Sequence, residues 1–505
     1  MKYFSTRSGC DAVSFEHAVI AGLAPDGGLY IPSESIQAPS DFLTAWKDLT
    51  FQQLAAEIFS LYIPESEVPR ADLEDLIAKS YSTFKVPEVT PVRALNADKN
   101  QYLLELFHGP TYAFKDVALQ FVGNLFEYFL TRRNVGKAAD ALDREKITVI
   151  GATSGDTGSA AIYGLRNKKD VSVFILYPEG RVSPIQEQQM TTVLDPNVHT
   201  ITVPGTFDDC QDLVKQMFAD KEFNSKYHVG AVNSINWARI LAQITYYFAS
   251  YFQFAKTKGS DVKVKYVVPT GNFGDILAGF YAEKLGLPIE LTVATNANDI
   301  LYRFFKSGAY TKENEVHATL SPAMDIIVSS NFERFLWHAA RSTVAKSDTE
   351  AGSLVKQWMD ELKATGSFRV PSEVHKLASS TFGAQHTNDK TTKTTIAKVY
   401  NEYCPNYVLD PHTAVGVNAA WLEQEADADK HKVYVTLSTA HPAKFSEAVN
   451  EALVGVKGYS FENDVLPDEF KVMMQAKTKK IKANSSEKAE IQQIVVSELA
   501  KEQQL

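Results

Sequence analysis

The stretch Tyr266-Val-Val-Pro-Thr-Gly-Asn-Phe-Gly-Asp-Ile-Leu-Ala-Gly279 decides the fold of this 505-residue chain. It predicts a buried strand that enters a glycine-rich loop and then opens a helix. Gly271 and Gly274 let the backbone approach a ligand closely, and N–H groups at a helix start can hold a phosphate. We interpret Asp275 as the N-cap of the helix. The alternative is a tight turn that only joins a strand to a helix.

A second stretch, Val149-Ile-Gly-Ala-Thr-Ser-Gly-Asp-Thr-Gly-Ser-Ala-Ala161, has the same design. A strand runs into small hydroxyl residues and glycines, and a helical pattern follows. Backbone N–H groups and hydroxyls that converge at a helix start suit an anion, and a substrate carboxylate is the anion that we expect. The alternative is an ordinary turn that Ser, Thr or Asp caps.

A third stretch, Glu105-Leu-Phe-His-Gly-Pro-Thr-Tyr-Ala-Phe-Lys-Asp116, contains a Gly-Pro turn and leads into a largely buried apolar helix. Lys115 lies at the start of that helix. The positive helix end and the neighbouring Phe114 disfavour its ammonium form, and a neutral amine is what Schiff-base chemistry requires. The alternative is a lysine whose amine extends into solvent.

The rest of the chain sets these stretches in an α/β protein. Short β-branched runs alternate with turns and helical patterns, which is typical of parallel sheets with crossover helices. The strand runs are 146–150, 171–177, 199–203, 262–268, 289–293 and 432–437. Helical patterns cover 51–62, 72–81 and 331–344, and 300–400 is predicted to be a mainly helical insertion. The charged tail, 468–505, predicts a surface helix or a frayed end.

Composition limits the classes of function. The chain has 51 Lys and Arg against 61 Asp and Glu, a net charge of −10, which argues against a nucleic-acid partner. Its 3 cysteines lie far apart, and neither a signal peptide nor an apolar run of membrane-spanning length occurs. We therefore expect a cytoplasmic protein without a membrane partner. The motifs of zinc sites, serine hydrolases and P-loops are absent, so we expect no metal.

Together the three stretches place a reactive lysine, a carboxylate-binding loop and a phosphate-binding loop on one scaffold. These are the groups that pyridoxal 5′-phosphate requires when it acts on an amino acid. The residues therefore indicate a pyridoxal-phosphate enzyme.

Six parts of the chain carry a resemblance to a known family. They are Tyr3–Arg7 with Ala24–Tyr30, His108–Asp116, Ala152–Gly158, Asn233–Arg239, Gly271–Asp275 and Ser321–Asp325. Through them nearly the whole chain resembles the long-form threonine synthases, which are tryptophan-synthase-β-like, or fold-type II, pyridoxal-phosphate enzymes. The resemblance implies an N-terminal domain, 1–90, a large cofactor domain, 91–135 with 229–505, and a small mobile domain, 136–228. It leaves a monomer or a homodimer open.

The resemblance also implies roles for single residues. Lys115 matches the Schiff-base lysine, and Thr439 matches the hydroxyl that faces the pyridine nitrogen of the cofactor. The residues that match the loop around the cofactor phosphate are Gly271, Asn272, Phe273, Gly274 and Asp275. Those that match the loop around the substrate carboxylate are Ser154, Gly155, Asp156 and Thr157.

One residue departs from the pattern of the wider superfamily. Many fold-type II enzymes have an asparagine where this chain has Asp156, and that asparagine bonds the 3′ oxygen of the cofactor. A carboxylate cannot donate a hydrogen bond unless it is protonated, so this contact is not carried over. For the substrate phosphate, the candidates are Arg239 and Asn236, with Ser183 and Gln186 behind them. The alternative for Arg239 is a structural ion pair.

The family converts O-phospho-L-homoserine and water into L-threonine and phosphate, the last step of threonine biosynthesis. The resemblance implies the same carbon–oxygen lyase reaction here, with Lys115 as the base and acid that moves protons. Three alternatives stay open. The chain could be another fold-type II lyase such as an amino-acid dehydratase or a cysteine synthase, a phospho-lyase that yields a keto acid from the same substrate, or a metabolite-binding protein without activity.

Overall fold

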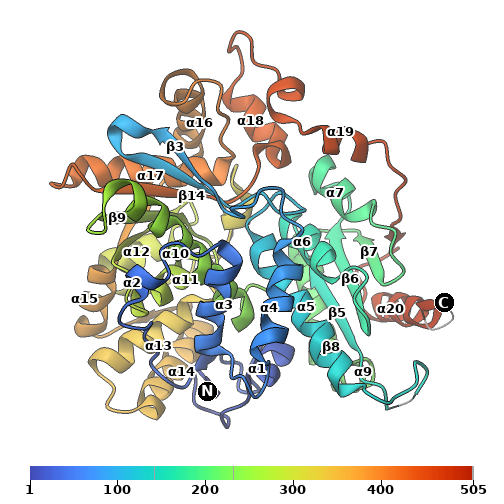
Figure 1. Ribbon diagram of the computed structural model, residues 1–505. Helices are drawn as coiled ribbons and strands as arrows, with labels where there is room; N and C mark the ends of the chain where they lie inside the picture. Colours follow the sequence, from blue (N-terminus) through green and yellow to red (C-terminus); the bar gives the residue numbers. More distant parts are fainter. Residues whose placement is uncertain (142, 231–232, 503–505) are drawn as a thin grey trace.

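Two parallel sheets organise the molecule, and helices cover their faces (Figure 1). The computed structural model describes residues 1–141, 143–230 and 233–502. The first sheet has the order β13 (Phe382–His386), β10 (Ile289–Thr295), β9 (Val264–Pro269), β14 (Val433–Ser438), β4 (Gln101–Glu105) and β3 (Val92–Asn96). Its neighbours are parallel, except for the antiparallel pair of β3 and β4.

The second sheet is parallel throughout. Its order is β15 (Ile481–Lys482), β7 (Val198–Val203), β6 (Val171–Pro178), β5 (Ile147–Ala152) and β8 (Val229–Gly230). Every residue of β6 and of β7 is buried, because helices or loops cover both faces of such a sheet. The α/β fold class and all six predicted strand runs are therefore confirmed.

Helices form the crossover connections between successive parallel strands, because two parallel strands cannot be joined by a tight turn. The helices of the structure are α1 (Phe15–Ala21), α2 (Phe42–Ala45), α3 (Phe51–Tyr62), α4 (Arg70–Tyr81), α5 (Lys115–Arg133), α6 (Asp156–Leu165), α7 (Pro184–Thr191), α8 (Phe207–Ala219), α9 (Lys221–Tyr227), α10 (Trp237–Lys258), α11 (Gly274–Lys284), α12 (Ile300–Ser307), α13 (Phe332–Thr343), α14 (Asp348–Thr365), α15 (Ser372–Thr381), α16 (Asp389–Lys398), α17 (Pro411–Ala426), α18 (Ser446–Ala452), α19 (Asp468–Met473) and α20 (Lys488–Glu502). In the described parts of the chain, no helix combines the length and the apolarity that a membrane crossing needs.

The N-terminal segment shares its core with the first sheet. Two short strands, β1 (Tyr3–Ser5) and β2 (Tyr30–Pro32), pair antiparallel, and α3 and α4 pack on α10 and α5. The ring centroids of Phe59 in α3 and Phe121 in α5 are 4.7 Å apart. The helical patterns predicted for this segment are confirmed, because their apolar stripes face α5 and α10.

Helices α5 and α6 join the layers of the two sheets at very short range. A Cβ on Gly123 of α5 would lie 1.9 Å from the carbonyl oxygen of Gly164 in α6. A Cβ on Gly164 would in turn lie 2.5 Å from the carbonyl oxygen of Leu119. Only glycine permits this contact between two backbones.

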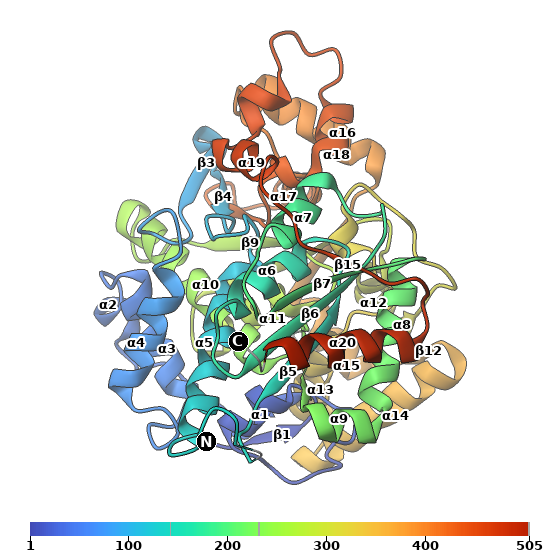
Figure 2. The ribbon, with the colours of Figure 1, turned by 90° about the vertical axis from the view of Figure 1, so that its right-hand side faces the viewer.

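Two segments in the second half of the chain contain elements beyond those predicted. The range predicted as a helical insertion contains α12 to α16, a small hairpin of β11 (Ala309–Thr311) and β12 (Ser367–Arg369), and β13, which is the edge strand of the first sheet. For the charged tail, the predicted surface helix is confirmed by α20, and the alternative of a frayed end is wrong over its described residues. The tail crosses to the second sheet, where β15 pairs with β7 and α20 buries Ile491 and Val495 (Figure 2).

Candidate active site

Three loops that leave neighbouring strands of the first sheet form the centre of the candidate site. Strand β4 leads to Lys115 at the start of α5, β14 leads to Thr439, and β9 leads to the Gly271–Asp275 loop. The carboxyl ends of β9, β14 and β4 meet at one edge because these strands are adjacent and parallel. The backbone N–H of Phe114 donates to the carbonyl oxygen of Thr439 at 2.8 Å, which joins two of the loops.

Lys115 is buried, with only 8% of its surface exposed. The alternative of an amine in solvent is therefore wrong. The pKa of Lys115 is lowered to about 8, mainly by burial. The charge of Asp156 opposes this shift, and the cations Lys444 and Arg239 add to it. Among the described residues its amine has no hydrogen-bond partner, and the ring of Phe114 lies 5.7 Å away. A neutral amine is thus available near neutral pH.

The Gly271–Asp275 loop has carbonyl groups that are hydrogen-bonded and N–H groups that are open within the described structure. The hydroxyl of Ser329 donates to the carbonyl oxygen of Gly271 at 2.6 Å, and the backbone N–H of Asn331 donates to that of Asn272 at 3.0 Å. The N–H groups of Gly271, Asn272 and Phe273 have no acceptor in the part of the chain that the structure describes. The carbonyl oxygens of the loop thus already accept hydrogen bonds, whereas these N–H groups are free to donate to a ligand. Such an arrangement forms a binding site for an anion.

Asp275 has a different place from the one that we predicted. Helix α11 begins at Gly274, its N-cap is Phe273, and no side chain caps it. The carboxylate of Asp275 accepts from the hydroxyls of Tyr246 and Tyr247 in α10, and burial raises its pKa to about 7. The N-cap interpretation is wrong because these buried tyrosines draw the carboxylate away from the helix start.

The Ser154–Thr157 loop is organised by a residue just before it. The hydroxyl oxygen of Thr153 accepts from the backbone N–H groups of Gly155 at 2.9 Å and Gly158 at 2.8 Å. Helix α6 then begins at Asp156. The N–H groups left without an acceptor among the described residues are those of Ser154, Asp156 and Thr157. This second set of open amides also suits an anion.

Asp156 is paired with a lysine that the sequence analysis missed. The amine of Lys444 lies 2.7 Å from Oδ1 of Asp156, and Lys444 is fully buried. Burial alone would raise the pKa of Asp156, but the charges of Lys444 and Lys115 outweigh it and hold that pKa below its ordinary value. Asp156 is therefore an ionised acceptor. The signal for Lys444 is its apolar setting in Pro442-Ala-Lys-Phe445, directly after β14.

Arg239 is a buried cation without an anionic partner. It lies in α10 with 4% of its surface exposed, and its Nη1 atom is buried without a hydrogen bond. It forms no ion pair with any residue that the structure describes, so the structural ion pair that we considered is absent. Burial lowers the pKa of Arg239 to about 10. An unpaired buried guanidinium is suited to an anionic ligand.

The other residues predicted for the substrate phosphate have local partners. Asn236 caps α10, because its side-chain oxygen accepts from Ala238 N at 3.0 Å and its amide donates to Val19 O at 2.8 Å. Ser183 caps α7 and donates to the carbonyl oxygen of Lys444 at 3.2 Å. Gln186 donates to Asp156 at 3.0 Å. Ser183 and Gln186 thus lie beside the Asp156–Lys444 pair, whereas the polar atoms of Asn236 serve the helix end.

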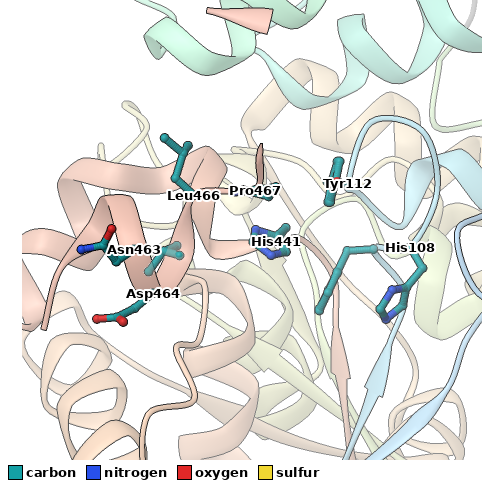
Figure 3. Close-up of a pocket in the computed structure, with 9 residues that line it drawn as sticks. His108, Tyr112, His441, Asn463, Asp464, Leu466 and Pro467 are labelled. Carbon is teal, nitrogen blue, oxygen red and sulfur yellow. The ribbon is translucent and has the colours of Figure 1, made fainter. Parts of the chain in front are cut away.

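A cavity of about 380 Å³ lies next to the segments that carry Lys115 and Thr439 (Figure 3). Tyr112 and His441 form the wall on the side of these segments, and the backbone N–H of His441 donates to Tyr112 O at 3.1 Å. The opposite wall is the segment 463–467 near the C-terminus. Among the described residues that line this cavity there is no lysine or arginine, so these residues lack the cations that a phosphate group requires.

Pyridoxal phosphate fits the chemistry of these residues. Its carbonyl group matches the buried amine of Lys115, which has no partner among the described residues, and its phosphate matches the open N–H groups of Gly271, Asn272 and Phe273. Arg239 and the Ser154–Thr157 amides remain for two further anionic groups.

Comparisons with known proteins agree with this geometry. Residues 2–81 match the family profile described as threonine synthase N terminus, 413–495 match threonine synthase, C-terminal, and 85–390 match pyridoxal-phosphate dependent enzyme. Threonine synthase of Saccharomyces cerevisiae is 59% identical over 94% of this chain and 94% of its own. That of Pseudomonas aeruginosa is 43% identical over 90% and 91%.

Solved structures give the same result. The crystal structure of threonine synthase from yeast has a TM-score of 0.95 and 56% identity, and covers 99% of both chains. The structure of pyridoxal-phosphate-bound threonine synthase from Brucella melitensis has a TM-score of 0.87 and 40% identity, again over 99% of both. With three family profiles along its length and relatives this similar, the chain belongs to the threonine synthase family of fold-type II pyridoxal-phosphate enzymes.

Proposed function

We propose that this protein is a pyridoxal-phosphate-dependent lyase that converts O-phospho-L-homoserine and water into L-threonine and phosphate. Its membership in the threonine synthase family supports the reaction. One observation on the site supports it most directly. A buried lysine with a pKa of about 8 lies close to a buried arginine that has no anionic partner among the described residues.

In this proposal the cofactor is held by the loops of the first sheet. Lys115 supplies the amine, the amides of the Gly271–Asp275 loop take the cofactor phosphate, and Thr439 lies at the pyridine nitrogen. When bound, pyridoxal phosphate links to an amine and accepts the electron pairs that departing protons leave on carbon. A threonine hydroxyl suits a neutral pyridine nitrogen, because it can donate a hydrogen bond without supplying a negative charge.

Lys115 moves the protons of the reaction. Its neutral amine takes a proton from Cα, releases that proton to solvent, and then takes one from Cβ of the substrate, after which phosphate departs from Cγ. The lysine returns its proton to Cγ. Water adds its hydroxyl to Cβ while its proton passes to the phosphate, and a proton from solvent returns to Cα through the lysine. The sum is the loss of phosphate and the gain of water. A pKa of about 8 suits a group that must both accept and donate near neutral pH.

Two separate groups bind the anions of the substrate. The open amides of Ser154 to Thr157 take the carboxylate, as the start of α6 suits a negative charge. Arg239 takes the phosphate, with Ser183 nearby. We do not retain Asn236, because both polar atoms of its side chain already have partners.

The proposal includes the domain arrangement. Residues 1–90 form the N-terminal domain, 91–135 with 229–505 the cofactor domain, and 136–228 a small domain that moves to enclose the substrate. We add β15 and α20 to the small domain because they pack on its sheet. A cytoplasmic location and a monomer or homodimer complete the proposal. The free thiols Cys10, Cys210 and Cys404 suit a reducing compartment.

The reaction is tested by its products. Purified protein with pyridoxal phosphate is incubated with O-phospho-L-homoserine, and threonine, phosphate and keto acid are measured together. We expect threonine and phosphate in equal amounts. Phosphate with a keto acid would identify a different lyase, and no phosphate release would leave a binding protein.

The assignment of Arg239 has its own test. Arg239→Leu should weaken the binding of O-phosphohomoserine by about tenfold to a hundredfold, because a charge-assisted hydrogen bond is lost. Binding of alanine, which lacks the phosphate, should change little. Both are measured by titration of the cofactor spectrum, with Arg239→Lys as the variant that keeps the charge. Equal weakening of both ligands would assign Arg239 to the fold or to the carboxylate.

A further inference from the structure

We propose that Lys444 is a second functional lysine of this site, whose ammonium group binds an anionic oxygen beside Lys115, and that Asp156 is the residue that positions it. The inference rests on the proposed function, because the anionic oxygen belongs to the bound cofactor or to the substrate carboxylate. Neither the family profiles nor the sequence patterns assign a role to Lys444.

The hydrogen bonds of Lys444 leave room for a ligand. An ammonium group has three N–H donors. One reaches Oδ1 of Asp156 at 2.7 Å, and one reaches the carbonyl oxygen of Thr111 at 2.8 Å. The third has no acceptor in the described parts of the chain. Lys444 has an exposed fraction of 0%, and a buried donor without an acceptor is costly unless a ligand supplies one.

The position of Lys444 relative to Lys115 points to the same conclusion. The two amines are close enough that the charge of Lys444 disfavours the ammonium form of Lys115. Asp156 lies near both lysines, and of the two it pairs with Lys444. The charges that act on one another here are the cations Lys115, Lys444 and Arg239 and the carboxylates Asp156 and Asp116. Three cations against two carboxylates leave a net positive charge when Lys115 is protonated. A bound oxygen anion would neutralise this charge.

Three separate segments fix the position of Lys444: one carries its backbone, and two contact its amine. Lys444 belongs to the short turn Pro442–Phe445 that follows β14 of the first sheet. Thr111 lies in the loop before Lys115, and Asp156 opens α6 beside the second sheet. A long flexible side chain that is fixed at both sheets has already lost its freedom before a ligand arrives. This preorganisation is typical of a binding group and exceeds what a surface ion pair needs.

The pair also explains why this chain has an acid at position 156. An ionised Asp156 is only an acceptor, so it cannot itself bind an anionic oxygen. Through Lys444, however, its charge places a strong donor in the site. Gln186 donates to the same oxygen of Asp156 at 3.0 Å and helps to fix it. Asp156 and Lys444 therefore form one unit, in which the carboxylate positions and the ammonium binds.

The main test is Lys444→Met, which keeps the length of the side chain and removes its charge. Lys432→Met is the matched control, because Lys432 is also buried and ion-paired but lies at the start of β14, with Asp427 at 2.7 Å. Two quantities are measured on the holoenzyme. They are the pH midpoint of the visible absorbance of the bound cofactor, and the affinity for alanine from spectral titration.

The two sources of the oxygen give different results. If Lys444 binds an oxygen of the cofactor, its loss should raise the pH midpoint by about one unit and weaken cofactor binding about tenfold, because a nearby cation that stabilises the anion is removed. If it binds the substrate carboxylate, the midpoint should stay and the affinity for alanine should fall about tenfold or more. Lys432→Met should change neither quantity.

A second variant covers the case in which Lys444→Met does not fold. The double variant Asp156→Asn, Lys444→Gln replaces the ion pair with two neutral amides and leaves no unpaired charge in the interior. It should change the midpoint or the affinity in the same direction but by a smaller amount, because the loss of the Asp156 charge partly offsets the loss of the Lys444 charge, and its stability should be near normal. Unchanged midpoint, cofactor affinity and alanine affinity in a folded variant would overturn the inference and leave the pair a structural link.

Different measurements test this inference and the proposed function, so that either can fail without the other. Parent protein that binds the cofactor but forms no threonine from O-phosphohomoserine would contradict the proposed function. The Lys444 measurements use only the cofactor spectrum and alanine, so they can be carried out and interpreted in either case.

Discussion

The Gly271–Asp275 loop and the Ser154–Thr157 loop have the same local design but different supports. Each follows a parallel strand and leaves amides open at a helix start. The first is held by its own layer, through Ser329 and Asn331 on its carbonyls. The second is held across the molecule, because the charge of Asp156 is paired with Lys444 from the turn after β14 of the first sheet.

This difference in supports indicates that the two loops suit different ligands. A loop with neutral supports inside one layer keeps its shape whatever the second sheet does. A loop whose carboxylate reaches across to the other sheet depends on the contact between the two. The first design suits a cofactor that stays bound through many turnovers, and the second suits a substrate that enters and leaves.

The largest expected effect comes from Lys115, the buried lysine of the candidate site. Lys115→Ala should lower threonine formation by about 10⁴-fold, because the proton-moving amine is lost. Borohydride should then fix no cofactor to the protein. Activity and mass spectrometry of the reduced protein check this. A variant that still forms a reducible covalent link would assign the linkage to another lysine.

The next largest effect is expected in the Gly271–Asp275 loop, where a substitution should weaken the binding of the cofactor. A Cβ on Gly271 would lie 3.0 Å from Cα of Met324 and 3.1 Å from the carbonyl oxygen of Ala323, and neither backbone atom can move freely. Gly271→Ala should therefore weaken cofactor binding about tenfold or more. Gly274→Ala is the control, because its Cβ would have ordinary contacts of 3.4 Å or longer. Equal losses would show that the contact with Met324 is unimportant.

The corresponding change in the other loop should act on the substrate. Gly155 has a φ of 142°, and a Cβ there would lie 2.3 Å from the side-chain oxygen of Gln186. Gly155→Ala should raise KM for O-phosphohomoserine by about tenfold through backbone strain, with cofactor affinity nearly unchanged. Steady-state kinetics and cofactor titration measure the two. A comparable loss of cofactor affinity would end the distinction between the loops.

The smallest effect concerns the buried acid of the first loop. The pKa of Asp275 is raised from 3.8 to about 7 by burial, so the folded protein favours the protonated form. Its contribution to stability is complete below pH 3.8 and is lost as the pH rises through 7. Asp275→Asn should remove this dependence and raise the free energy of unfolding at pH 8 by about 1 kcal/mol. Urea unfolding from pH 5 to 8 tests it, and a slope unchanged from the parent would contradict it.

Much of the fold was predictable because buried parallel strands are continuous β-branched runs. The strand at 171–177 is an example, and β6 extends it by one residue. The edge strands β13 and β15 were not predictable from the sequence. Strand β13 reads Phe-Gly-Ala-Gln-His and β15 lies in a lysine-rich run. Both form at the edge of a sheet, where a neighbouring strand decides pairing more than local propensity does.

The site was predictable only where its chemistry is local. Lys115 has its signal in the adjacent turn and helix, and the open amides follow from strand–loop–helix patterns. Lys444 and the true role of Asp275 depend on partners elsewhere in the chain. Lys444 bonds Thr111 across 333 positions, and Asp275 bonds Tyr246 across 29. A single sequence does not indicate which of its distant residues form such pairs, because only the tertiary fold brings the two partners together and buries them.

The tail that completes the second sheet has a consequence for how the protein is made. The hydroxyl of Thr200 in β7 donates to the carbonyl oxygen of Lys479 across 279 positions, just before β15 pairs with β7. Until β15 has been synthesised, β7 therefore remains an uncovered edge of β-branched residues. Such an edge invites pairing with another nascent chain. Strand β15 begins at Ile481 and β7 ends at Val203, 278 positions earlier, so this edge stays open while all the residues between them are translated.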